Sequence, residues 1–274
     1  MICLLILLAL WGGISYLLSM ISTNPWLWFV WVPVGFMAMM ILFVAWIYLI
    51  VCPILKRINP DSKFKAFYAI HIMKFVKVVC LIRLKVEGIE NLTNEHKTLY
   101  VSNHKSLLDP IFIYIATKRS LTAAGKADLF NVKLLMPLIR AFHIIKIDRR
   151  SDREAAKGIV EGIKYMKGGN GVIIFPEGGI KTREVEQMVA LKPGAYKLAT
   201  KSEAVIQPIA IIGSSKLAKR KLLKPFAKVV VRFLPPITPS DYKDLNTHEI
   251  GHKVLEMVNN NFTHEAKYAI EEEN

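Results

Sequence analysis

Residues 97–117 read KTLYVSNHKSLLDPIFIYIAT, and this stretch predicts a short strand, a polar turn and a helix in immediate succession. Lys97–Val101 has the apolar and β-branched character of a strand, and Leu107–Thr117 is rich in the Ile, Phe and Tyr of a buried helix. Either Ser106 caps that helix, or Asp109 does so with the following proline at the first helical position. A strand that runs through a tight turn into a helix is typical of an α/β domain.

The polar turn holds His104 and Asp109, an imidazole and a carboxylate five residues apart. In a continuous helix, residues at this spacing point to different faces, so the two side chains converge only if a turn lies between them. A carboxylate bonded to one ring nitrogen fixes the tautomer and leaves the other nitrogen free to take a proton from a hydroxyl. The pair is therefore a candidate general base with its orienting residue; the alternative is that both are surface or capping residues.

Two further segments each contain an apolar strand that is followed by glycines or by basic residues. Residues 171–179, GVIIFPEGG, read as a buried strand that presents Glu177 at its end, and the two glycines after it permit a close backbone approach or a positive φ. Lys181 and Arg183 follow, so an anion could bind there. Residues 144–150, IIKIDRR, end another apolar strand in two arginines, whose forked guanidinium groups suit a phosphate.

Together these segments resemble the motifs of the glycerolipid acyltransferases, the family typified by 1-acyl-sn-glycerol-3-phosphate acyltransferase. The resemblance rests on the Asn-His-x4-Asp signature, the Phe-Pro-Glu-Gly block, a block that ends in arginine and a strand around a proline. The matching positions are Asn103, His104 and Asp109; residues 175–178; residues 147–149; and residues 205–209. The four blocks occur in the family order, which makes the match specific.

The resemblance implies a single-step acyl transfer to a lysophospholipid without an acyl-enzyme. His104 is expected to act as general base on the free hydroxyl and Asp109 to orient it, while acyl carrier protein or coenzyme A carries the acyl group as a thioester. Backbone amides near Gly178 are the natural oxyanion donors. Glu177 is better suited to a hydroxyl or a basic partner than to a phosphate. The expected binding residues for the glycerol phosphate are Arg149, Glu177, Gly178, Lys126 and Lys192.

Two positions depart from the usual pattern of that family. His143 stands where the family has a glycine, six residues before the arginine of its block, and Gly179 stands where the family has a threonine. Neither change removes a catalytic group, but both bear on the shape of the phosphate pocket. Among the basic residues, Lys126 could equally be a surface lysine, and Arg150 is expected to cap or to pair on the surface.

The first 55 residues contain no Asp, Glu, Lys, Arg or His, a longer apolar run than a soluble core helix needs. Two apolar segments, Met1–Ile21 and Trp26–Leu55, predict a helical hairpin, since about 20 residues cross the hydrocarbon core. Lys56 and Arg57 follow, so the positive-inside rule places the rest of the chain on the cytoplasmic side of the cell membrane. A hairpin that enters one leaflet and a cleaved signal peptide are the alternatives.

The chain is therefore expected to comprise a membrane hairpin, residues 1–57, and an α/β acyltransferase domain, residues 58–274, with a mixed sheet flanked by helices. Residues 61–82 predict an amphipathic helix, basic on one side and aromatic on another, that lies at the membrane interface or is an ordinary domain helix. Strands are expected at 84–86, 97–101, 143–147, 171–175, 204–212 and 227–234, helices at 107–117, 151–167 and 193–201, and a terminal helical segment at 242–272.

The net charge, the cysteine count and the absent motifs favour some classes of protein over others. Lys and Arg number 37 against 22 Asp and Glu, a net charge of +15, which suits anionic membrane lipid; no nucleic-acid motif is present, so we expect no nucleic-acid partner. Three cysteines and no cluster of metal ligands argue against a disulfide or zinc framework, and we expect no metal or cofactor. Another lysophospholipid or glycerol 3-phosphate as acceptor, a non-catalytic membrane lipid-binding protein, and a hydrolase remain open, although a Gly-x-Ser-x-Gly elbow is absent.

Overall fold

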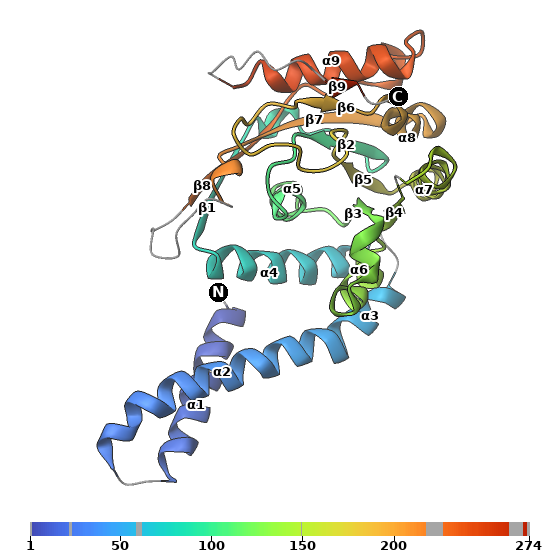
Figure 1. Cartoon of the computed structure of the whole chain (residues 1–274). Coiled ribbons are helices and arrows are strands. Elements are labelled where there is room, and N and C mark those ends of the chain that lie inside the picture. The colour runs from blue at the N-terminus through green and yellow to red at the C-terminus, as the bar shows by residue number, and fades with distance from the viewer. Residues whose placement is uncertain are drawn as a thin grey trace. The chain divides into compact units, whose positions relative to one another are not determined.

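The structure is a computed structural model that describes residues 2–21, 24–58, 62–148, 150–217, 227–262 and 271–272. The chain divides into two compact units, Met1–Ile58 and Asn59–Asn274. Described helices make up the first unit, and the second holds a seven-stranded sheet (Figure 1).

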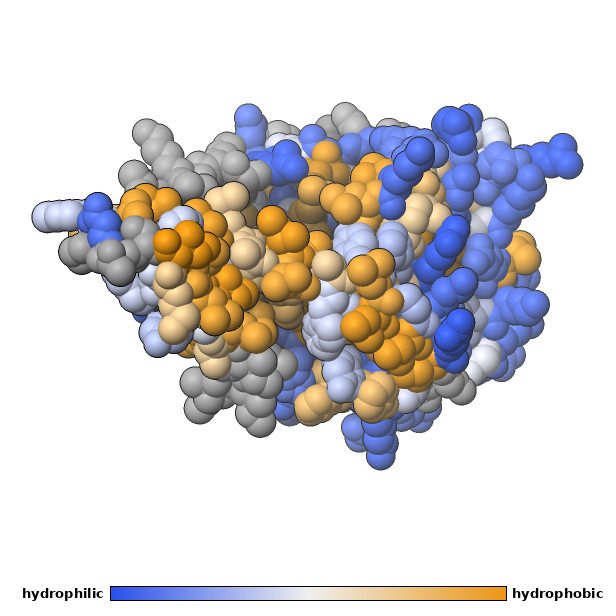
Figure 2. Space-filling model, turned by 90° about the horizontal axis from the view of Figure 1, so that it is seen from below, coloured by the Kyte–Doolittle hydropathy of each residue, from blue (hydrophilic) through white to orange (hydrophobic). Residues whose placement is uncertain are grey.

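The first unit is built from apolar helices: α1 (Ile2–Ser19), α2 (Trp28–Trp46) and α3 (Cys52–Arg57), with a π-helical turn at Ile47–Val51. α1 and α2 pack together, and the indole Nε1 of Trp11 donates to the carbonyl of Val32 at 2.8 Å. Large apolar side chains of this unit are exposed and contribute to the orange surface in Figure 2. Within the described residues, Trp28–Arg57 is the one helix long and apolar enough to cross a membrane, at a mean hydropathy of 2.6. The predicted pair of N-terminal apolar helices is therefore present.

The sheet of the second unit has the strand order β1-β8-β7-β2-β5-β3-β4. Every neighbouring pair is parallel except β7 and β8, which are antiparallel, so the sheet is mixed as predicted. A separate short ladder pairs β6 (Ala190–Leu191) with β9 (Glu271–Glu272). The strands of the sheet are β1 (Ile82–Glu87), β2 (Thr98–Ser102), β3 (Leu121–Lys126), β4 (Ile145–Ile147), β5 (Gly171–Ile174), β7 (Val205–Ile212) and β8 (Ala227–Phe233).

Helices cover both faces of this sheet (Figure 1). Successive residues of a strand point to opposite faces, so Leu99 and Val101 of β2 join one buried cluster and Tyr100 joins the other. α4 (Lys63–Val79) and α5 (Asp109–Thr117) pack on the Tyr100 face, and α7 (Asp152–Lys167), α8 (Lys197–Ser202) and α9 (Thr247–Asn259) pack on the opposite face. α6 (Met136–Ala141) precedes β4. The layers leave the ends of the central strands β2 and β5 side by side.

Several elements differ from the prediction, among them α6, which lies where no helix was expected. No strand was expected at Leu121–Lys126, which nevertheless forms β3, because it pairs with β5 through its first half and with β4 through its second. Its sequence LTAAGK has little of the β-branched content that marks a strand, so the pairing partners decide its structure. The C-terminal helix ends at Asn259, residues 263–270 of the predicted helical segment lie outside the described residues, and Glu271–Glu272 forms β9 instead of helix because it pairs with β6.

The helix predicted at residues 61–82 is α4, which packs on the sheet through Ala66, Ala69 and Ile70 and exposes an aromatic edge. Lys65 is also buried, and its Nζ lies 2.7 Å from Nδ1 of His143. Burial lowers the pKa of Lys65 to about 8, and burial together with the neighbouring lysine lowers the pKa of His143. α4 is therefore an integral helix of the α/β unit, anchored by a buried amine.

We expect the free energy of unfolding to rise between about pH 8 and about pH 10, because the unfolded state, in which lysine has a pKa of about 10.4, binds more protons than the folded state in this range. Chemical denaturation in detergent, followed by circular dichroism at several pH values, measures this rise. Lys65→Met removes the group, so the rise should be smaller in this variant. An equal rise in both proteins would exclude Lys65 as its source.

Candidate active site

The turn after β2 brings His104 and Asp109 together. Asp109 is the first residue of α5, and its Oδ2 lies 3.0 Å from His104 Nδ1 and accepts the backbone N–H groups of Lys105 and Ser106 at 2.7 and 2.8 Å. Leu108, which neither predicted arrangement named, is the N-cap residue, and its N–H donates to the Ser106 hydroxyl at 3.2 Å. One carboxylate oxygen therefore closes the turn and also orients the imidazole.

The face of the His104 ring is supported as well. It stacks on Phe175, with ring centroids 4.1 Å apart and an angle of 18° between the planes, and 15% of the His104 side chain is exposed. Nδ1 faces Asp109, whereas Nε2 has no hydrogen-bond partner among the described residues. The arrangement leaves one ring nitrogen available to a substrate proton, which is the requirement for a general base.

Glu177 reaches the same turn from the loop after β5. Its Oε1 accepts the backbone N–H of His104 at 2.8 Å, and its Oε2 accepts Lys105 Nζ at 2.8 Å and the N–H of Val189 at 3.2 Å. The side chains of Glu177 and Lys105 are both 0% exposed. Burial raises the pKa of Glu177, although the nearby ammonium opposes that shift. Both carboxylate oxygens thus bind protein groups, and the basic partner expected for Glu177 is Lys105.

The residues after Glu177 form a turn that requires glycine. Gly178 and Gly179 have φ values of 78° and 149°, in the region that side chains rarely adopt. The Gly178 N–H donates to the Phe175 carbonyl at 3.1 Å, so this amide is engaged within the protein and is not a free oxyanion donor. Farther along, Arg183 is exposed and its Nε donates to the Lys105 carbonyl at 3.2 Å. A guanidinium group therefore lies against the candidate catalytic turn, residues 103–109.

The other predicted binding residues lie at the ends of neighbouring elements. Lys126 ends β3 and pairs with Asp128 at 2.5 Å, both side chains being 63% exposed. The backbone N–H of Lys192 donates to the Pro176 carbonyl at 2.9 Å, which ties its segment to the Phe-Pro-Glu-Gly loop. Arg149 lies outside the described residues. Arg150 forms an ion pair with the aspartate that follows β4, as expected of a residue that pairs locally.

Two residues of the motif have roles that the sequence reasoning did not assign: Asn103 and Lys105. The Asn103 amide, fully buried, donates to the Ile211 carbonyl at 2.8 Å and accepts the Ile211 N–H at 2.9 Å; it also donates to the Glu186 carbonyl at 2.8 Å. Its side chain thus continues the pairing of β2 with β7 after the strand has ended at Ser102. The only sequence signal for either residue is its position beside His104.

The backbone conformation of His143 bears on one departure from the family pattern. Its φ of 53° is a left-handed conformation that favours glycine, the usual residue at this position. It precedes β4, and its carbonyl accepts the Thr122 hydroxyl at 2.7 Å, near the start of β3. These positions mark the amino-terminal edge of the parallel strands, opposite to the edge that holds His104. The His143 side chain therefore lies away from the turn that holds His104 and Asp109.

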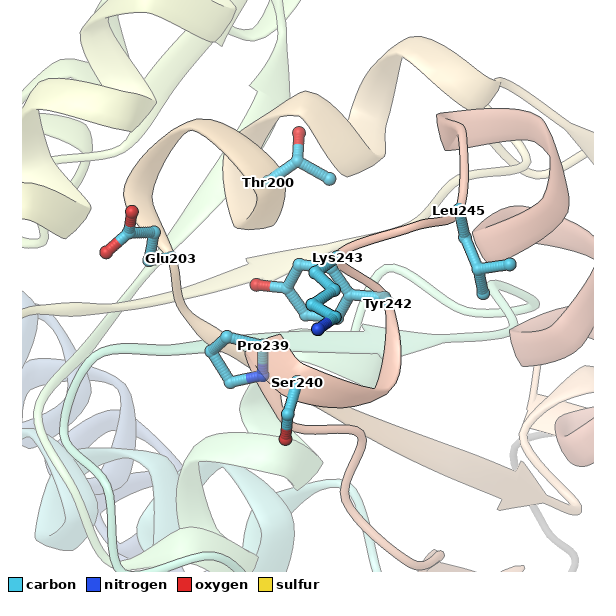
Figure 3. A pocket seen from close by; sticks show the side chains of 7 residues that line it. All are labelled: Thr200, Glu203, Pro239, Ser240, Tyr242, Lys243 and Leu245. Carbon is cyan, nitrogen blue, oxygen red and sulfur yellow. The ribbon is translucent and has the colours of Figure 1, made fainter.

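A separate hollow of about 440 Å³ lies between the end of α8 and residues 239–245 (Figure 3). Thr200 and Glu203, which line it, lie just before β7 begins, so the hollow is also at the amino-terminal edge. The Tyr242 hydroxyl, on its wall, donates to the Ala204 carbonyl at 2.7 Å. None of its lining residues belongs to the four sequence blocks, and the hollow is distinct from the catalytic turn.

Known proteins are similar to this chain in sequence and in fold. The Acyltransferase family model matches residues 83–212, which include the catalytic turn and the Glu177 loop. A Mycoplasma genitalium protein named as a probable 1-acyl-sn-glycerol-3-phosphate acyltransferase is 27% identical over 215 residues, which cover 70% of this chain and 79% of that protein. The 1-acyl-sn-glycerol-3-phosphate acyltransferase of Limnanthes douglasii is 29% identical over 165 residues, 59% of this chain and 57% of that protein.

The crystal structure of the 1-acyl-sn-glycerophosphate acyltransferase PlsC from Thermotoga maritima has the same fold, with a TM-score of 0.64 at 22% identity, over 80% of this chain and 90% of that one. The sheet and its flanking helices therefore follow an architecture already known among acyltransferases. The matched model and the relatives agree with the sequence blocks: the chain has an Acyltransferase domain over residues 83–212 and is similar to the 1-acyl-sn-glycerol-3-phosphate acyltransferases.

Proposed function

We propose that this protein is a membrane-associated 1-acylglycerol-3-phosphate O-acyltransferase, which makes phosphatidic acid in phospholipid biosynthesis. The observation that carries the proposal is the 3.0 Å contact between His104 Nδ1 and Asp109, which leaves Nε2 free, in a chain with an Acyltransferase domain. The names of the relatives support 1-acylglycerol 3-phosphate as the acceptor. The acyl donor is a thioester of acyl carrier protein or coenzyme A, and the mechanism uses no metal or cofactor.

In the proposed reaction, both proton transfers take place at His104. Nε2 takes the proton of the acceptor hydroxyl while the oxygen attacks the thioester carbonyl, and Asp109 keeps the proton on Nδ1 so that Nε2 is the acceptor. The tetrahedral intermediate then expels the thiolate, which receives the proton from Nε2. An oxygen ester forms and a thioester breaks, and no acyl-enzyme is involved. Holding both substrates in register can contribute about 7–11 kcal/mol.

Cationic groups around the turn are proposed to bind the phosphate of the acceptor. Arg183 lies against the turn through its contact with the Lys105 carbonyl. Lys126 and Lys192 belong to neighbouring segments and keep their predicted roles, as does Arg149, which lies beyond the described residues. Glu177 holds the turn rather than the phosphate, since both of its oxygens bind protein groups.

The N-terminal helices are proposed to hold the protein at the cell membrane with the α/β unit on the cytoplasmic side. Trp28–Arg57 is long enough to span a bilayer, and Lys56 and Arg57 end α3. A lipid acceptor and a polar thioester donor would then meet where the membrane borders the cytoplasm.

The purified full-length protein in detergent or vesicles, given radiolabelled lysophosphatidate with oleoyl-coenzyme A or oleoyl-acyl carrier protein, should form phosphatidate. Parallel reactions with glycerol 3-phosphate and with lysophosphatidylcholine test the acceptor, and product analysis tests the reaction. Free fatty acid as the main product would show that the protein is a hydrolase and not a transferase. No product with either donor would favour a lipid-binding protein without catalytic activity.

A further inference from the structure

Lys105 is a fully buried lysine next to the candidate base, and a buried charge needs a reason. Taking an ammonium and a carboxylate out of water costs free energy that a single ion pair seldom returns in full. Here Lys105 Nζ lies 2.8 Å from Glu177 Oε2, and neither side chain is exposed to solvent. The pair joins the turn after β2 to the loop after β5, two segments 72 residues apart in sequence.

The contacts of Glu177 show what the pair holds. One carboxylate oxygen binds the backbone N–H of His104 at 2.8 Å, and the other binds the ammonium of the next residue at 2.8 Å. The N–H of Val189 adds a third donor at 3.2 Å. His104 is therefore held by Asp109 at its ring and by Glu177 at its backbone, and Lys105 fixes the orientation of the Glu177 carboxylate.

We propose that the Lys105–Glu177 ion pair is a positioning device that fixes the backbone of His104 so that Nε2 faces the acceptor hydroxyl. Neither residue contacts substrate in this role, because the pair is closed off from solvent and both Glu177 oxygens are occupied. The proposal rests on the proposed acyltransferase function, and it assigns Glu177 to the support of the base instead of to the binding of the glycerol phosphate.

Removing one charge would leave the other buried without a partner, so the test uses two double variants that remove both. Lys105→Met/Glu177→Gln keeps an oxygen that can accept the His104 N–H, whereas Lys105→Met/Glu177→Leu has none. For lysophosphatidate acylation, we expect kcat to fall on the order of 100-fold in the leucine variant and by clearly less in the glutamine variant. The KM for lysophosphatidate should stay unchanged in both.

Lys65→Met is the matched control, because Lys65 is equally buried and its partner, His143, lies at the opposite edge of the sheet. This variant should keep the wild-type kcat. Nitrogen-15 NMR of histidine-labelled protein gives an independent readout, with the His104 signals identified by their loss in His104→Ala. The Nδ1–H tautomer should dominate in the wild type and the glutamine variant, and both tautomers should appear in the leucine variant.

A raised KM with unchanged kcat would show that Glu177 binds substrate and would overturn the proposal. Equal kcat values in the two folded double variants would overturn it as well, since the hydrogen bond to His104 would then have no effect. If the wild-type protein itself forms no phosphatidate, the proposed function fails, whereas the NMR comparison still decides whether the ion pair positions the imidazole.

Discussion

His104→Ala is expected to lower kcat for phosphatidate formation by about 10²–10⁴-fold, the usual contribution of a positioned general base. The imidazole has Nδ1 on Asp109, Nε2 without a partner among the described residues, and one face on Phe175. Alanine removes the base but leaves the hydrogen bond from the residue 104 backbone to Glu177 available. The loss should therefore appear in kcat, with the fold intact by circular dichroism.

Initial rates with saturating acyl donor and varied lysophosphatidate separate kcat from KM in this variant. His71→Ala is a suitable control, because His71 lies on α4 and its Nδ1 contacts the Phe67 carbonyl at 2.7 Å, within its own helix. This control should behave as the wild type. If His104→Ala retained more than about a tenth of the wild-type kcat, a different group would have to serve as the base.

Asn103→Ala is expected to lower the free energy of unfolding by about 3 kcal/mol, since it leaves buried backbone groups without partners. The lost side chain makes three hydrogen bonds with backbone groups, two to the peptide groups of Ile211 and one to the Glu186 carbonyl, and it also accepts the Ser102 hydroxyl at 3.2 Å. An unsatisfied buried donor or acceptor costs about 1–3 kcal/mol, and some relaxation of the turn will reduce the sum. Activity should fall too, because the next residue is His104.

Equilibrium denaturation in detergent, followed by far-ultraviolet circular dichroism, measures the Asn103 effect. Tryptophan fluorescence is unsuitable, because all five tryptophans lie within the first 46 residues and report on the other unit. Asn170→Ala is the matched control: its amide contacts the Tyr165 and Gly168 carbonyls at the end of α7 and is only partly buried. The control should lose less than about 1 kcal/mol, and equal losses would mean that pairing with β7 does not stabilise the turn.

The hydrophobic pattern of the sequence was sufficient to predict much of the fold. The apolar run before Lys56 predicted the pair of helices, and the strand-turn-helix of residues 97–117 is present as β2, the turn and α5. β3 was missed because its alanines and glycine have no strand preference of their own, and its two neighbours in the sheet supply the pairing. Patterns within a segment predict that segment, but they do not report the partners that lie elsewhere in the chain.

In the candidate site, too, the local pattern predicted some contacts and did not reveal those with distant residues. The spacing of His104 and Asp109 predicted their convergence across a turn, and the structure has it. Nothing local marks Lys105 or Lys65 as buried, because lysine is ordinarily solvated and each one depends on a partner more than 70 residues away. The order of the chain likewise conceals that Glu177 serves the turn, since only the parallel pairing of β2 with β5 brings the two loops together.

The order in which the supports of the catalytic turn are synthesised has a consequence for biogenesis. The N-terminal helices and the motif at residues 102–109 leave the ribosome before Glu177, Val189 and Ile211, which hold the turn through hydrogen bonds. If the N-terminal helices hold the nascent chain at the membrane, as proposed, that chain at first carries the histidine and aspartate without the contacts that orient them. The proposed acyl transfer should begin only once β7 has emerged and docked, so a translation product truncated before β7 would be inactive.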